Sequence, residues 1–160
     1  MRIVPALLLC LLTVSGGAAR AADWSLYWGA EAGLLLPQGE RNRTGVQAVG
    51  RLGLQAARLP GFAAEAELGT TLKAAQYRSS DLKLTTLAGY LAWRSAGRWY
   101  FKVRGGGLWE WTRLGAGRAS DGGLSGGFGG GYRFDDGRRL ELEFTVIERN
   151  VNMLSLSYRF

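Results

Sequence analysis

The segment VNMLSLSYRF, residues 151–160, alternates strictly between two kinds of side chain. In an extended strand, Leu156, Tyr158 and Phe160 share one face. Arg159 and two serines take the other face. Chain ends usually fray and carry polar residues. Alternation that runs to an aromatic end residue therefore indicates a strand that is paired and half-covered by an apolar environment.

The same period of two recurs along the chain, which indicates a protein built of strands. With the closing segment, the candidate strands number eight, each of about ten residues. The seven earlier candidates are residues 24–36, 45–56, 62–73, 84–94, 98–111, 124–134 and 139–148.

The connections between these strands alternate in length. Residues 57–61, 94–97 and 135–137 are short and rich in the residues of tight turns. The connections at 37–44, 74–81 and 112–120 are longer and polar, and only the last, 148–152, breaks the pattern. Short turns at one end and longer loops at the other are typical of a transmembrane barrel. We therefore predict an all-β fold, an eight-stranded antiparallel up-and-down transmembrane β-barrel with both chain ends at the short-turn, periplasmic end.

The N-terminal segment has the three parts of an export signal. Arg2 precedes an apolar run that is shorter than the ~20 residues of a spanning helix, and an Ala-Arg-Ala site follows. We predict that residues 1–21 are a cleaved signal peptide and that residues 22–160 form one outer-membrane barrel domain. The alternatives are a buried N-terminal helix or a lipoprotein at Cys10, where Leu9 is too large for a lipoprotein signal.

Alternation alone fits a soluble sandwich as well as a membrane barrel, and three observations favour the barrel. The first is the export signal. The second is the composition of the polar face, where one or two ionic residues per strand lie among glycines. The third is a set of aromatic residues near strand ends, as interfacial girdles require. These aromatic residues are Trp24, Trp28, Phe62, Trp93, Trp99, Trp109, Trp111, Tyr132, Phe134 and Phe160.

The polar faces project both signs of charge into the predicted lumen, and an eight-stranded barrel is just wide enough for side chains to fill it. Unpaired buried ions are costly, so we expect a paired, plugged lumen, the alternative being a solvated sheet face. The charged lumen residues are predicted to be Glu31, Arg51, Glu65, Glu67, Lys102, Arg104, Glu110, Arg133, Glu141, Glu143 and Arg159.

The composition narrows the chemistry available to the protein. The chain has no histidine, and its single cysteine is in the signal segment, so Ser-His and Cys-His catalysis is excluded and no metal site or cofactor is expected. The net charge of +7 falls to +5 without Arg2 and Arg20. The remaining cations are dispersed among carboxylates, so we expect no nucleic-acid partner. The segment GGFGGG, residues 126–131, lacks the Lys-Ser/Thr and helix of a phosphate-binding loop.

Residues 124–160 resemble the C-terminal half of the small Gram-negative outer-membrane β-barrel proteins of the OmpA-like type, and residues 24–36 resemble their opening strand. The positions that carry the resemblance are Gly127, Gly129, Tyr132, Phe134, Leu140, Glu143, Phe144, Tyr158 and Phe160. The resemblance implies an outer-membrane location and a monomer. It also implies that Leu156, Tyr158 and Phe160 form the signal for the barrel assembly machinery, with periplasmic chaperones as further partners in biogenesis. The peptidoglycan-binding role of OmpA itself is not implied, since the resemblance covers the barrel only.

Three functions remain open at this stage. The first is a non-enzymatic integral protein with a structural or surface-interaction role in the envelope. The second is a narrow pore or transporter, and the third is a lipid-modifying enzyme, which the missing histidine opposes. For the first function we predict outer-membrane lipid and lipopolysaccharide as partners, because arginine pairs well with phosphate. The predicted contacts are Arg41, Arg43, Arg78, Arg113 and Arg118, all placed in outer loops.

Overall fold

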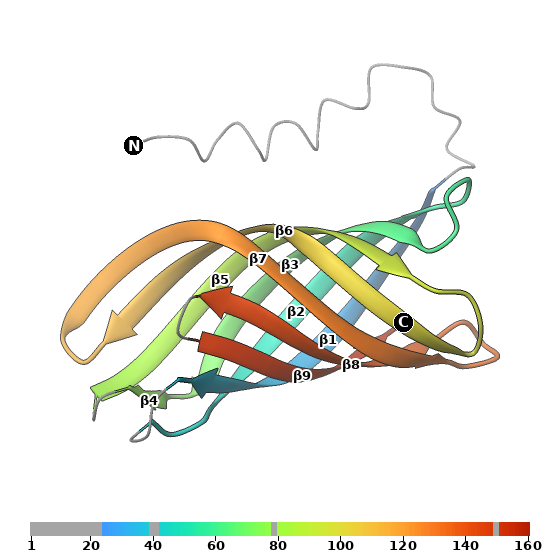
Figure 1. Cartoon of the computed structure of the whole chain (residues 1–160). Helices are drawn as coiled ribbons and strands as arrows, with labels where there is room; N and C mark the ends of the chain where they lie inside the picture. The colour runs from blue at the N-terminus through green and yellow to red at the C-terminus, as the bar shows by residue number, and fades with distance from the viewer. Residues whose placement is uncertain (1–23, 39–41, 78–79, 149–150) are drawn as a thin grey trace, which may run out of the picture.

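The computed structural model describes residues 24–38, 42–77, 80–148 and 151–160. These residues form strands joined by turns and short connections (Figure 1). No helix among them is long and apolar enough to cross a membrane. The strands are β1 (Trp24–Pro37), β2 (Gly45–Ala56), β3 (Phe62–Lys73), β4 (Ala75–Tyr77), β5 (Ser80–Arg94), β6 (Trp99–Leu114), β7 (Gly117–Arg133), β8 (Arg139–Glu148) and β9 (Val151–Arg159).

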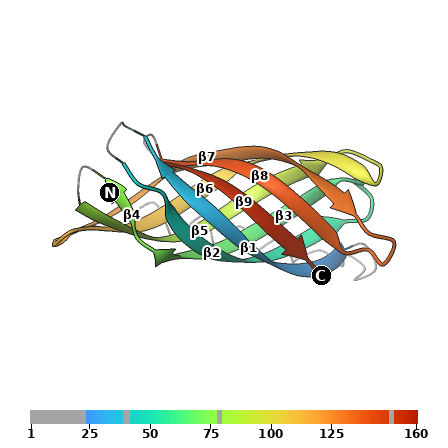
Figure 2. The ribbon, with the colours of Figure 1, turned by 90° about the horizontal axis from the view of Figure 1, so that it is seen from below.

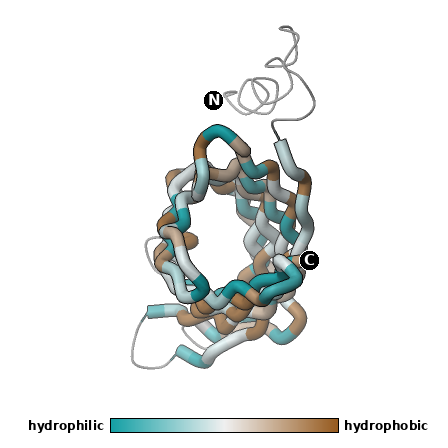
Figure 3. Tube along the Cα trace, turned by 90° about the vertical axis from the view of Figure 1, so that its right-hand side faces the viewer, coloured by the Kyte–Doolittle hydropathy of each residue, from teal (hydrophilic) through white to brown (hydrophobic). Residues whose placement is uncertain are grey.

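Eight of these strands close into an antiparallel barrel, as the sequence predicts. Each spanning strand pairs with its neighbours in the chain, and β1 pairs with β9 to complete the ring. Strand β3 pairs directly with β5, so the three-residue β4 is not one of the eight ring strands; it pairs with the start of β5, and its Ala75 is buried. The view from below shows β1 beside β9, and the view along the axis shows the closed ring (Figures 2 and 3). Closure leaves no free edge in the ring.

The two faces of each strand differ in burial, as an alternating sequence requires. Along the middle of β1, buried and exposed residues alternate, with Tyr27 and Glu31 buried inside the barrel. Large apolar side chains cover the outside: Leu26 is 72% exposed and Leu91 is 73% exposed. A soluble protein would bury such side chains, whereas lipid accepts them.

Three tight turns define one end of the barrel, and each contains a glycine with positive φ: Gly61, Gly97 and Gly137. At Gly61 a Cβ would also lie 2.4 Å from the Arg94 carbonyl oxygen, so only glycine fits. In the turn before β8, the Arg138 side chain bonds to the Asp136 carboxylate and holds the pKa of that carboxyl below its usual range.

The opposite end of the barrel departs from the prediction at two connections. The connection predicted at 74–81 contains β4 and the first residues of β5. Residues 112–120, predicted as a polar loop, instead continue β6 and β7 into a long hairpin that turns at Gly115 with φ of 56°. Residues 117–125 of β7 pair only with β6, because β8 begins to pair at Gly126. The hairpin thus projects beyond the ring (Figure 1). The polar residues of this segment therefore indicate that it contacts water, and they do not indicate that strand pairing ends there.

An aromatic girdle surrounds part of the short-turn end. Its rings contact one another in series from β6 to β1, with centroids 4.0–6.4 Å apart. The rings belong to Trp99, Tyr132, Phe134, Tyr158, Phe160 and Trp28. Such girdles mark the interface between lipid and water in outer-membrane barrels.

Candidate functional site

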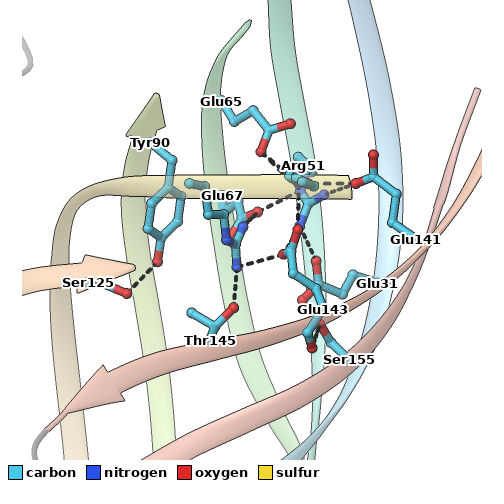
Figure 4. A network of polar contacts seen from close by, with 12 residues as sticks. Glu31, Arg51, Glu65, Glu67, Tyr90, Ser125, Glu141, Glu143, Thr145 and Ser155 are labelled. Atoms are coloured by element: carbon cyan, nitrogen blue, oxygen red, sulfur yellow. Dashed lines mark hydrogen bonds and ion pairs between the residues drawn. The ribbon is translucent and has the colours of Figure 1, made fainter. Parts of the chain in front are cut away.

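The middle of the lumen is filled by a network of ion pairs with Arg51 of β2 at its centre (Figure 4). The Arg51 guanidinium lies 2.5 Å from oxygens of Glu31 and Glu67. It lies 3.0 Å from oxygens of Glu141 and Glu143 on the opposite wall. One side chain thus joins carboxylates from β1, β3 and β8 across the barrel.

Two further cations share Glu141 with Arg51 and add a fifth carboxylate, Glu65, to the network. Lys102 Nζ of β6 lies 2.6 Å from Glu143, 3.0 Å from Glu141 and 3.2 Å from Glu65. Arg94 of β5 lies 2.5 Å from Glu65 and 2.7 Å from Glu141. All five side chains are buried. The carboxylates Glu65, Glu141 and Glu143 therefore each have more than one cationic partner.

Arg104 of β6 completes the network towards the loop end. Its guanidinium pairs with Glu67, lies 2.9 Å from Glu143 and donates a 2.8 Å hydrogen bond to the Thr145 hydroxyl. It also covers the ring of Tyr90, with 4.3 Å from its central carbon to the ring centroid. These contacts bring five carboxylates and four cations into one buried cluster, a nearly balanced set of charges.

Two tyrosines add hydrogen bonds to this cluster. Tyr27 donates its hydroxyl proton to Glu65, and Tyr100 donates to Glu141 at 2.7 Å. A glycine opposite Tyr100 makes room for the ring, because a Cβ at Gly131 would lie 2.5 Å from its Cζ. Gly131 thus leaves room for the large lumen side chain of Tyr100.

The lumen between the network and the loop end is mainly apolar. Inward-facing residues of several strands form one buried cluster there: Leu35, Val49, Ala75, Leu82, Leu84, Ala88, Tyr90, Leu108, Ile147, Val151 and Met153. Contact with lipid requires only the outer face of the barrel to be apolar, so residues on the inner face can be either polar or apolar. Ion pairs and apolar packing together fill the interior.

Three buried carboxylates could in principle hold a metal ion, since oxygens of Glu31, Glu67 and Glu143 lie within 4.8 Å of one another. Arg51 already bonds to all three of them. The positive charge that a metal would supply is therefore provided by the chain, and the arrangement does not point to a metal centre.

The predicted lumen charges all face inward, but not all of them join the network. Glu110 lies towards the loop end, where the Thr112 hydroxyl donates to it at 3.3 Å. Arg133 and Arg159 lie at the short-turn end. Arg159 donates a 3.0 Å hydrogen bond to Gln55 and forms no ion pair with a glutamate among the described residues.

Two lumen cations were missing from the predicted set, Arg94 and Arg139. Arg94 is 2% exposed and Arg139 is 7% exposed. Both lie where a strand meets a tight turn. The local sequence there indicates the turn, but it does not indicate clearly which side chains point into the lumen. The parity of the adjacent strands was a usable signal: Arg139 alternates with Glu141 and Glu143, which face inward.

The predicted lipopolysaccharide contacts fall into three groups. Arg41 and Arg78 lie outside the described residues. Arg43 is exposed in the connection after β1, where its backbone pairs with Gln76. Arg113 and Arg118 were predicted in a loop, but they lie directly opposite each other in β6 and β7.

Arg113 and Arg118 belong to a longer row of cations. Lys83 of β5 lies opposite Arg113 on its other side, so three cations stand in register across three strands. All three side chains are exposed. We call Lys83, Arg113 and Arg118 the outer cation row.

The predicted assembly residues lie on the outside of β9. Leu156 is 51% exposed and Phe160 is 48% exposed, and the Phe160 ring stacks on Trp28 at 4.0 Å. The rings of Tyr158 and Phe160 meet in a T-shaped arrangement, with their centroids 4.8 Å apart. The predicted signal peptide, residues 1–21, lies outside the described residues.

Comparison with known proteins supports the fold. No family model matches the chain, and no curated protein matches it in sequence. Among solved structures, Neisserial surface protein A (NspA) matches with a TM-score of 0.61 and 16% identity over 85% of this chain and 97% of that one. OprG, an outer-membrane protein of Pseudomonas aeruginosa, matches with a TM-score of 0.54 and 11% identity over 86% and 95%.

A de novo designed protein, TMB2.3, matches almost equally well, with a TM-score of 0.53 and 14% identity over 86% of this chain and 94% of that one. A designed chain shares the fold without sharing an evolved role, so fold similarity alone does not assign a function. The predicted eight-stranded outer-membrane barrel fold is confirmed, and the predicted outer-membrane location agrees with these neighbours.

Proposed function

We propose that this chain is a non-enzymatic integral outer-membrane protein with a closed lumen, which acts in the envelope by binding lipopolysaccharide phosphates from its outer face. Residues 22–160 would form the barrel after removal of a signal peptide, residues 1–21. The observation that carries the proposal is the outer cation row of Lys83, Arg113 and Arg118 at the loop end of the barrel.

The outer cation row needs an external anion. Like charges directly opposite each other on neighbouring strands are destabilising. Among the described residues, Lys83, Arg113 and Arg118 form no ion pair with a carboxylate. They share a groove with Thr85 and Trp111, so hydroxyl and indole groups lie beside the charges.

Lipopolysaccharide phosphates suit this position. The loop end, opposite the predicted periplasmic end, is where the outer leaflet would meet the barrel. Arginine forms charge-assisted and often bidentate hydrogen bonds with phosphate. A phosphate group bound to the three aligned cations would therefore offset the repulsion among them. NspA, a structural neighbour, is named a surface protein, which is consistent with a role at this face.

The test compares two triple variants of the refolded protein. In the first, Lys83, Arg113 and Arg118 are changed to Gln. In the control, three arginines of the short-turn end are changed to Gln, so the net charge falls equally. The control residues are Arg58, Arg98 and Arg138.

Binding of detergent-dispersed lipopolysaccharide should weaken by about tenfold or more in the first variant, the loss expected for several charged hydrogen bonds. It should stay within about twofold in the control, whose changes lie at the far end. Dephosphorylated lipopolysaccharide should bind the unchanged protein as weakly as the first variant binds the phosphorylated form. Equal binding by both variants would reject the proposal.

The contents of the lumen support a closed barrel over the pore alternative. The ion-pair network joins β2 to β8 across the lumen, and the apolar cluster is buried as well. For the enzyme alternative, the chain offers no histidine, and each carboxylate of the ion-pair network bonds to a cation. In planar bilayers we expect no steady conductance, and steady channels on the nanosiemens scale would contradict a closed lumen.

A further inference from the structure

A second row of cations lies inside the barrel, at the end with the short turns. Arg133 of β7 lies directly opposite Arg139 of β8, and Arg139 lies directly opposite Arg159 of β9. Arg139, in the centre, is 7% exposed. We call these three residues the inner arginine row. Three like charges in register on neighbouring strands repel one another.

The inner arginine row has no acidic partner. None of the three guanidinium groups forms an ion pair with a carboxylate of the described residues. The nearest inward-facing carboxylate along β8 is Glu141, which already binds Arg94 and other cations of the network. The charges of the row are therefore not neutralised by the chain.

The contacts that the row does make are with neutral groups and leave donors unused. The Arg159 guanidinium lies over the ring of Tyr27, with its central carbon 3.4 Å from the ring centroid. Arg139 and Arg159 both donate to one oxygen of Gln55, at 3.4 and 3.0 Å. Arg133 and Arg139 lie over the ring of Tyr100, 5.9 and 5.7 Å from its centroid. Three buried donors have no hydrogen-bond acceptor in the part of the chain that the structure describes: Arg133 Nε, Arg139 Nε and Arg159 Nη1.

We propose that the inner arginine row binds a small tetrahedral oxyanion, a phosphate or sulfate group, at the short-turn mouth of the lumen. Such a group offers several oxygens to the unused donors, and guanidinium groups bind phosphate with geometric specificity. The shared oxygen of Gln55 shows that Arg139 and Arg159 already converge on one acceptor. This site is separate from the outer cation row in both face and end of the barrel.

The test uses the protein refolded in octyl glucoside, a detergent without phosphate. Sodium phosphate is titrated against sodium chloride at equal ionic strength, and the Nε–Hε signals of arginine are followed by NMR. The unchanged protein should give saturable shifts. In Arg139→Gln the apparent Kd should rise by about tenfold or more, since a charged donor group is lost.

The matched control is Arg138→Gln, the adjacent residue with the same change of charge. Its side chain is exposed and pairs with Asp136, so phosphate binding should stay within about twofold. If Arg139→Gln does not refold, Arg133→Gln replaces it with the same expectation. Equal weakening in variant and control, or absence of shifts with both inorganic phosphate and a phosphate-bearing lipid, would overturn the proposal.

A further arm separates the two sources of a phosphate group. Micelles that contain phosphatidylglycerol, in phosphate-free buffer, present the group on a lipid. A response to inorganic phosphate identifies a soluble oxyanion, and a response to the lipid alone identifies a headgroup at the lumen mouth. If neither probe shifts the signals of Arg133, Arg139 or Arg159, the site does not exist.

Discussion

Replacement of Arg51 by Met tests the ion-pair network at its centre. Arg51 bonds to four carboxylates at 2.5–3.0 Å, but the loss of its charge would affect them unequally. Glu67 would keep Arg104, whereas Glu31 has no other ion pair among the described residues. The variant would therefore leave one fully buried carboxylate without a partner.

A buried charge that loses its partner destabilises a protein by about 3–5 kcal/mol. We therefore expect Arg51→Met to lower the free energy of unfolding by about 3 kcal/mol or more, at least a hundredfold in the equilibrium constant. Adding Glu31→Gln removes the orphaned charge, so the double variant should regain about half or more of the loss. The surface variant Arg98→Met, whose pair with Asp135 is largely exposed, should cost about 1 kcal/mol at most.

Urea unfolding of the refolded protein in detergent, followed by tryptophan fluorescence and by the heat-dependent shift on a gel, measures these differences. Two results would refute the reasoning. One is an Arg51→Met variant within about 1 kcal/mol of the unchanged protein, and the other is a double variant no more stable than the single one. Either result would mean that the Glu31 carboxylate is not held by Arg51.

Two further predictions concern the wall of the barrel. Gly131→Ala should destabilise the fold by about 1–3 kcal/mol, because the added methyl group would overlap the Tyr100 ring. Gly105→Ala is the control, since no atom lies within 4 Å of the position of its Cβ. In the same urea measurement it should lower the free energy of unfolding by under about 1 kcal/mol. Phe160→Ala should slow folding several-fold more in vesicles that contain the barrel assembly machinery than in protein-free vesicles. The reason is that it removes the proposed assembly signal as well as the ring stacked on Trp28. Equal slowing in both kinds of vesicle would assign Phe160 a packing role only.

The sequence determines the faces of the barrel strands better than it determines their partners. Period-two alternation predicts that Arg51 and Glu141 both point inward, because each strand obeys its own parity. It does not predict that they meet, because residues 90 positions apart are brought together by the stagger of the strands around the ring. Arg94 and Arg139 escaped prediction at the boundaries of turns, where parity is hardest to assign.

The distribution of unpaired cations follows from these constraints. In the middle of the lumen the side chains are buried away from solvent ions, so the charges of the chain must neutralise one another. The four cations of the network, Arg51 and Lys102 among them, do so with five carboxylates. At both ends, water and mobile anions are within reach, and there the chain leaves cations in register without acids: the outer row at the loop end and the inner row at the short-turn end. Repulsion within each row persists unless an anion joins it. We therefore expect anions to bind most favourably at the two ends of the barrel.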